Sequence, residues 1–182
     1  MNDPLLPGRG CGGCTVCCTV LAIETEEIRK ASGAPCRHCA GGCAIHQTRP
    51  QVCRDYHCAW RTLPILSDAW RPDRSGVLAE LESESIPPQF GFSTGVSLML
   101  VGASPARTIR QSWFLDFVRT GILGNMPLFL ALPGPAGHHA AKLLLNEAEI
   151  IAAAESPLSA RLKDVLEKAL KRLQAYPFRP QT

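Results

Sequence analysis

The sequence predicts an α+β protein in which an irregular, cysteine-rich amino-terminal module packs on a small antiparallel sheet with two or three helices. Three observations carry this prediction. All nine cysteines lie within the first 58 of the 182 residues. Short apolar runs bounded by turn residues follow residue 76, as is typical of strands. An amphipathic stripe near the end of the chain indicates a helix. The expected domains are a cysteine-cluster module over residues 1–62 and an α+β domain over residues 63–182.

The amino-terminal module has many glycines and little apolar periodicity, so it cannot bury enough apolar surface to fold by itself. Within it, residues 19–23 are expected to form a strand and residues 24–30 one or two helical turns. Residues 63–75 have the composition of a connector. The tryptophans on either side, Trp60 and Trp70, are expected to pack the module onto the second domain.

Four strands are expected in the second domain. In the first of them Val77, Ala79 and Leu81 alternate with Glu80 and Glu82, which predicts a strand with one exposed face. The expected strands cover residues 77–81, 96–101, 128–132 and 141–145.

Two helices are expected, each beginning with serine followed by proline, a residue pair that favours a helix start. The first covers residues 104–121 and the second residues 156–176. On the outer face of the second helix, Asp164–Lys168 and Glu167–Lys171 have the spacing of ion pairs one turn apart.

Composition limits the classes of function. Hydrophobic residues make up 46% of the chain and the net charge is +3, without a basic stripe, which disfavours nucleic acid as a partner. The start of the chain lacks a secretory pattern, and the longest apolar stretch, residues 121–137, is interrupted by prolines. We therefore expect a cytoplasmic protein with no membrane partner. Thiols stay reduced in that compartment, and an odd number of cysteines fits poorly with complete disulfide pairing.

The cysteine spacing predicts a metal site. Cys14-x2-Cys17 and Cys36-x2-Cys39 are separated by 18 residues, which is the spacing of a zinc ribbon with four thiolate ligands. The remaining cysteines are candidate ligands of a second ion: Cys11, Cys18, Cys43, Cys53 and Cys58. One or two Zn²⁺ ions are therefore the preferred cofactor.

The same cysteines admit an alternative metal. Cys11-x2-Cys14-x2-Cys17 resembles the three-cysteine loop of a [4Fe–4S] protein, whose fourth ligand lies elsewhere in the chain. Soft thiolates suit both zinc and iron–sulfur centres, so iron or a [4Fe–4S] cluster stays open.

Arginines near the cysteines are candidate groups around the metal. A zinc ion with four thiolates carries two net negative charges, which nearby cations can offset. Arg49 and Arg54 lie between or beside cysteines, and we expect them to contact the cofactor. His38, His46 and His57 are further candidates to complete a second site.

Residues 11–60 resemble the CxxCxxCC family, also called YkgJ-type cysteine-cluster proteins, a family of zinc- or iron-chelating domains. The resemblance rests on Cys11-Gly-Gly-Cys14-Thr-Val-Cys17-Cys18 and on Cys43-Ala-Ile-His46-Gln-Thr-Arg49-Pro50-Gln-Val-Cys53-Arg54. It implies metal chelation. The cysteines that recur in the family map onto Cys14, Cys17, Cys18, Cys36, Cys43 and Cys53, with Cys11 and Cys58 as further members. Two differences stand out: His46 occupies the usual position of a tyrosine, and Cys39 is an addition.

The leading functional hypothesis is a metal-binding protein whose thiolate site is mainly structural or chelating. An iron–sulfur enzyme in electron transfer or protein side-chain modification is the alternative, and an adaptor for a protein partner is a third possibility. The motif Gly91-x-Ser93-x-Gly95 lacks the strand before it and the helix after it that a nucleophile needs, so no catalytic residue is predicted.

Overall fold

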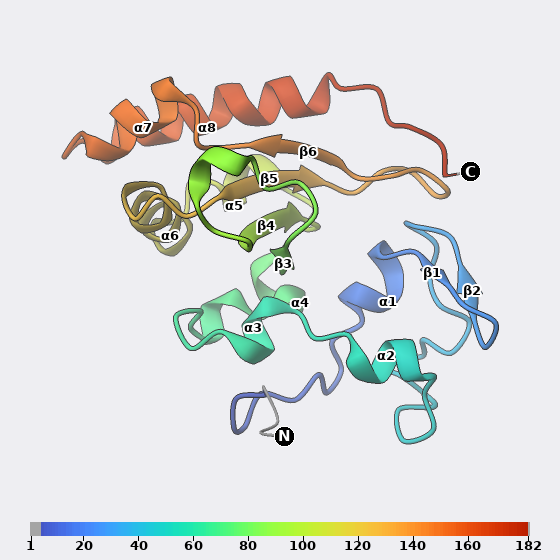
Figure 1. The fold of residues 1–182 in the computed structure, drawn as a ribbon. Coiled ribbons are helices and arrows are strands. Elements are labelled where there is room, and N and C mark those ends of the chain that lie inside the picture. Colours follow the sequence, from blue (N-terminus) through green and yellow to red (C-terminus); the bar gives the residue numbers. More distant parts are fainter. Residues whose placement is uncertain (1–4, 182) are drawn as a thin grey trace.

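A computed structural model describes residues 5–181 of the chain and confirms an α+β fold (Figure 1). The helices are α1 (Val16–Val20), α2 (Gln51–Asp55), α3 (Ala59–Thr62), α4 (Pro72–Ser75), α5 (Pro105–Thr108), α6 (Ser112–Leu123), α7 (Ala148–Glu155) and α8 (Ser159–Gln174). The strands are β1 (Ile23–Glu24), β2 (Arg29–Lys30), β3 (Val77–Glu82), β4 (Gly95–Leu100), β5 (Leu128–Leu132) and β6 (Ala141–Leu144). Two short 3₁₀ helices, η1 (Asp68–Trp70) and η2 (Pro88–Phe90), complete the elements.

The four expected strands form one sheet in the order β3-β4-β5-β6. The prediction of an antiparallel sheet is wrong at its centre, because β4 and β5 are parallel while the outer pairs are antiparallel. Parallel neighbours need a crossover connection, and the segment with α5 and α6 provides it.

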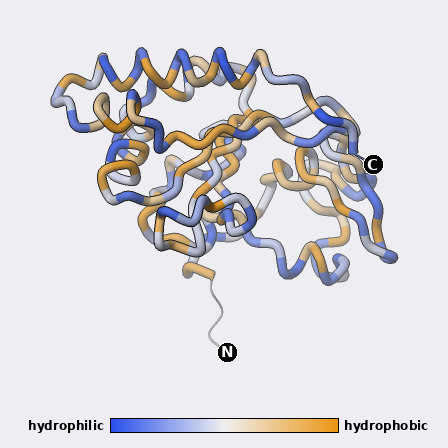
Figure 2. Tube along the Cα trace, turned by 45° about the horizontal axis from the view of Figure 1, so that its top comes forward, coloured by the Kyte–Doolittle hydropathy of each residue, from blue (hydrophilic) through white to orange (hydrophobic). Residues whose placement is uncertain are grey.

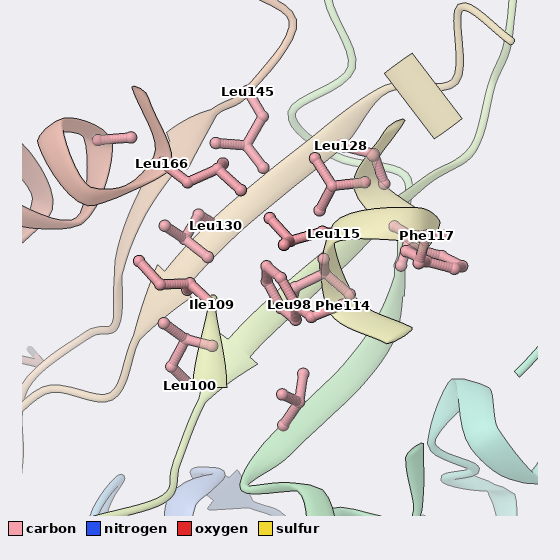
Figure 3. Packing of buried hydrophobic residues seen from close by; sticks show 14 of the residues in the cluster. Leu98, Leu100, Ile109, Phe114, Leu115, Phe117, Leu128, Leu130, Leu145 and Leu166 are labelled. Carbon is pink, nitrogen blue, oxygen red and sulfur yellow. The ribbon is translucent and has the colours of Figure 1, made fainter. Parts of the chain in front are cut away.

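Each face of the sheet is covered by a different part of the chain. Leu98 and Leu130 are neighbours across β4 and β5, and they belong to the large core that α6, α7 and α8 complete (Figure 3). On the other face, Leu78, Met99 and Ala131 form a smaller cluster against Val16, Val20 and Leu21 from the cysteine-rich segment. The cysteine-rich module therefore packs on the face of the sheet opposite α6, α7 and α8.

This cover overturns the prediction that β3 has a face exposed to solvent. Glu82 is only 8% exposed and Glu80 is half-buried, whereas Leu81 is 54% exposed. Side chains alternate along a strand, so Glu80 and Glu82 share a face with Leu78, which lies under the module. Glu80 accepts a hydrogen bond from the Tyr56 hydroxyl at 2.8 Å, and Glu82 is paired with Lys142.

The Glu82 carboxylate has a consequence for the pH dependence of stability. Burial opposes its charge, but hydrogen bonds from Lys142 and from the Glu84 and Ser85 backbone prevail and lower its pKa. A lowered pKa adds stability above the ordinary value of 4.5, and this stability is lost as the pH falls through the folded-state pKa. Glu82→Gln should therefore lower the urea midpoint at pH 7 and have a smaller effect below about pH 4.

The matched control is Glu84→Gln, which removes an exposed carboxylate from the same turn. It should leave the urea midpoint unchanged at both pH values. An effect of Glu82→Gln that is equal at pH 7 and pH 3 would show that the carboxylate charge contributes nothing.

The helices depart from the sequence prediction in two places. Residues 104–121 form two helices, because Gln111 is extended between α5 and α6. Ile109 and Phe114 are both fully buried, and in one continuous helix their five-residue separation would point them about 140° apart. Helix α7 has no counterpart in the sequence prediction. Helix α8 begins at Ser159, three residues after the predicted start at residue 156.

The outer face of α8 makes its ion pairs with other elements. The predicted pairs within the helix are not formed. Instead Glu167 contacts Arg110 and Lys168 contacts Glu149, each at 2.7 Å. All of these side chains are exposed or partly exposed, so each pair contributes little to stability. The alternation of hydrophilic and hydrophobic residues that predicted this helix is visible along it in Figure 2.

Two predictions inside the module are wrong. Residues 19–23 do not form a strand, because α1 extends to Val20. Residues 24–30 do not form helical turns but belong to a hairpin in which the two-residue strands β1 and β2 pair antiparallel. The short helix α1 places Val16 and Val20, which are four residues apart, on one face that packs against the sheet.

The module is anchored to the rest of the chain at two ends. At one end, the predicted role of Trp60 and Trp70 is confirmed, since both are buried in the large core. At the other, the Ser32 backbone N–H donates to the Gln181 side-chain oxygen, and the Ser32 carbonyl accepts a hydrogen bond from the Gly137 N–H. Within residues 5–181, no helix combines the length and apolar character needed to cross a membrane.

Candidate metal centre

Eight of the nine cysteines line one cavity of about 150 Å³, which lies between the module and strand β3. All nine are free thiols and partly buried. The eight are Cys11, Cys14, Cys17, Cys18, Cys36, Cys43, Cys53 and Cys58. The ninth, Cys39, is not part of the lining. The structure thus brings together cysteines that are up to 47 positions apart in the sequence.

The cavity wall is mostly apolar. Val16, Leu21, Ile28, Val52 and Leu78 contribute to it, and Leu78 belongs to β3. Apolar surroundings strengthen the attraction between thiolates and a cation and make unpaired thiolates costly. Burial accordingly raises the pKa of Cys14, Cys53 and Cys58 above the ordinary value of 9.0.

The inner cysteines, Cys11, Cys14, Cys17 and Cys58, form one neighbourhood. Cys11 and Cys14 both lie close enough to Cys17 and Cys58 for their charge to raise the pKa of each, after burial and hydrogen bonding. The charge of Cys11 also makes a smaller contribution that raises the pKa of Cys14. This group combines the amino-terminal loop with the start of α3.

The inner cysteines are held against the large domain. The Arg71 guanidinium donates to the Cys11 carbonyl at 3.1 Å, and the backbone N–H groups of Val16 and Asp73 donate to the Cys14 sulfur. Cys58 precedes α3 and packs against both core clusters. Arg71 and Asp73, at the start of α4, therefore hold the loop that carries Cys11 and Cys14.

The outer cysteines, Cys18, Cys36, Cys43 and Cys53, form a second neighbourhood. The charges of Cys18, Cys36 and Cys43 all act on Cys53 and raise its pKa, after the effect of burial. The Cys36 backbone N–H donates to the Cys18 carbonyl at 2.8 Å.

Cys17 and Cys18 mark the boundary between the two groups. They are successive residues of α1, so their side chains point about 100° apart. The Cys17 thiol donates a hydrogen bond to Cys18, which lowers the pKa of Cys18 to about 6 and raises that of Cys17. Lys30 and Arg49 add to the lowering at Cys18.

Lys30 is a residue near the outer cysteines that sequence reasoning missed. Its ammonium donates to the carbonyls of Thr19, Ala31 and Ala34 at 3.0, 3.1 and 2.7 Å. Burial lowers its pKa, while thiols including Cys36 and Cys18 favour the charged form. Nothing in the local sequence separates Lys30 from a surface lysine, because its partners are backbone groups of loops that only the fold brings together.

The two predicted arginines have different positions. Arg49 lines the cavity beside His46, and its buried Nε has no hydrogen-bond partner within the described residues. Arg54 is outside the lining and donates to the Gln51 side chain and, at 2.8 Å, to the Arg49 carbonyl. The structure therefore places Arg49 at the candidate site and Arg54 behind it.

The histidines are also divided. His38 and His46 line the cavity, and each is contacted by an arginine, Arg37 and Arg49 respectively. His57 is outside the lining, near Arg61. Tyr56, which was not predicted, lines the cavity, and burial together with Glu80 raises its pKa so that its hydroxyl stays protonated.

The structure does not bring the zinc-ribbon set together as one group. Cys14 and Cys17 are inner cysteines, Cys36 is an outer cysteine, and Cys39 lies outside the cavity. Over residues 5–181, no three Cys, His, Asp or Glu side chains surround a single point as a formed metal site. The donors nevertheless fit soft metal, since eight free thiols share an apolar-walled cavity with a guanidinium nitrogen that has no partner.

Comparisons with known proteins give no further guide to the chain. No family model, curated protein or solved structure matches it.

Proposed function

We propose that this protein is a cytoplasmic metal-binding protein whose thiolates hold zinc in a mainly structural or chelating role. The observation that supports this most is the gathering of eight free thiols on one apolar-walled cavity. Thiolates are the preferred ligands of structural zinc, and a set without carboxylates favours a closed site over a hydrolytic one. A reducing compartment suits nine free thiols.

The chain's own residues support metal binding in two further ways. Lys30 and Arg49 lie next to the outer cysteines, and Arg61 lies next to Cys58, so cations are available to offset thiolate charge. The apolar wall limits the access of water to the partly buried sulfurs, which would slow the loss of a bound ion. Bound zinc would supply cross-links between segments that bury little apolar surface of their own.

An iron–sulfur centre is the second candidate, and one observation favours it. Cys11, Cys14 and Cys17 have the spacing of a cluster-binding loop, and Cys58, which lines the same cavity, supports the presence of a remote fourth ligand. A protein of this kind would act in electron transfer or in the modification of protein side chains.

Metal analysis of protein purified without oxygen tests both candidates. We expect a colourless protein that contains zinc and no labile sulfide. A brown protein with about four irons and equivalent sulfide would support the second candidate. A folded protein without any metal would contradict both.

A further inference from the structure

A second cavity, of about 110 Å³, lies between helices α6 and α8. Apart from one leucine, its lining is polar and consists of Arg110, Ser112, Asp116, Arg119, Ser159 and Lys163. None of these residues lines the thiol cavity. We propose that this second cavity is a binding site for inorganic phosphate, independent of the thiolates.

The lining side chains occupy one face of each helix. In α6, Ser112, Asp116 and Arg119 are spaced by four and three residues, which places them one above the other along the helix. In α8, Ser159 and Lys163 are four residues apart and share a face for the same reason. The sequence of each helix thus presents cations and hydroxyls to the space between them.

Two of the cations have no partner in the protein. Within residues 5–181, neither the Arg119 guanidinium nor the Lys163 ammonium makes a hydrogen bond or an ion pair. The Arg119 Nη2 atom is also buried. A buried charged donor without an acceptor has lost its hydration without compensation. An anion in the cavity would supply the acceptor, and a guanidinium can hold a phosphate through two parallel hydrogen bonds.

The remaining charges leave the cavity positive. Arg110 is paired with Glu167 of α8 at 2.7 Å, so its charge is largely offset. Asp116 is exposed, and in the described part of the chain it pairs with neither Arg119 nor Lys163. Two unpaired cations therefore stand against one carboxylate. This balance favours an anionic ligand over a cationic one.

The starts of both helices add further donors. Ser112 is the first residue of α6 and Ser159 the first residue of α8, and neither helix has a side-chain cap. The N–H groups of a first helical turn carry partial positive charge and favour anions. They supplement the Arg119 and Lys163 side chains, which carry the main attraction.

Asp116 determines which anion the cavity accepts. A carboxylate repels an anion unless that anion has a proton to donate to it. At about pH 8, inorganic phosphate keeps one proton, whereas sulfate keeps none and a phosphate monoester, with a second pKa of about 6, has lost its own. Asp116 can therefore accept a hydrogen bond from inorganic phosphate and disfavours the other two anions.

Calorimetric titration of the full-length protein with sodium phosphate in a chloride buffer tests the proposal. Wild type should bind about one equivalent, and Arg119→Gln and Lys163→Gln should each weaken the affinity about tenfold or more. Lys163 is only partly buried, so its substitution should keep the fold even if Arg119→Gln lowers stability.

Arg161→Gln is the matched control, because it removes an exposed cation of α8 that lies outside the cavity. It should bind phosphate as wild type does. A wild type that takes up no phosphate at millimolar concentration would overturn the proposal. Binding that survives both the Arg119→Gln and the Lys163→Gln substitution would do the same.

A second titration tests the role of Asp116 and the source of the phosphate. At about pH 8, sulfate and O-phosphoserine should bind wild type about tenfold more weakly than inorganic phosphate. Asp116→Asn should narrow the preference over sulfate, because the amide no longer repels an unprotonated anion. Equal affinity of wild type for phosphate and sulfate, or tighter binding of O-phosphoserine, would refute the assignment to inorganic phosphate.

Discussion

Removal of the proposed metal by an anaerobic chelator is expected to unfold residues 11–58 and to leave the sheet domain folded. The module has a small share of the buried core, since within residues 5–58 the only apolar residue that is largely buried is Ile28. Metal–thiolate bonds in structural zinc sites are worth about 10 kcal/mol or more, which exceeds what this burial supplies. The buried residues of the large core, by contrast, all lie from Ala59 onward, although Cys58 packs against them.

Limited proteolysis with intact-mass analysis measures this effect. The chelated protein should be cut within residues 11–58 and yield a resistant fragment that begins near α3. Added Zn²⁺ should restore resistance, and Cys39→Ser should respond as wild type does. An unchanged cleavage pattern after complete metal removal would mean that carbon burial alone orders the module.

Trp60→Ala is the second change with a large expected effect. Trp60 is 5% exposed, lines the cavity and belongs to the large core. Its ring lies 5.4 Å from the Arg9 guanidinium and 5.9 Å from that of Arg71, which also holds the Cys11 carbonyl. Truncation of a buried tryptophan costs about 3–5 kcal/mol, and here it also releases both arginines. A fall in the urea midpoint should accompany weaker metal binding by the inner cysteines.

Trp60→Phe is the matched control. The buried Trp60 Nε1 has no hydrogen-bond partner within the described residues, so phenylalanine removes an unsatisfied donor and keeps an aromatic face for both arginines. We expect a cost below about 1.5 kcal/mol. Equal effects of the two substitutions would show that ring packing against Arg9 and Arg71 is unimportant.

The sheet shows which features of the fold local sequence predicts and which it does not. Strands at 96–101 and 128–132 could be predicted because they are apolar runs bounded by turn residues, and both are confirmed. Their parallel pairing could not, because strand direction is set by the crossover through α5 and α6. Glu80 and Glu82 were assigned to solvent by alternation, yet their face is covered by residues more than 20 positions away.

The sequence by itself determined that nine cysteines are concentrated in a segment with little apolar periodicity, because composition and spacing are local properties. Only the tertiary structure decided which thiols are neighbours. Cys58 joins Cys11 at the cavity because α3 packs in the core, and Cys39 is left outside the cavity lining. Those positions depend on contacts between distant segments, which spacing along the chain does not encode.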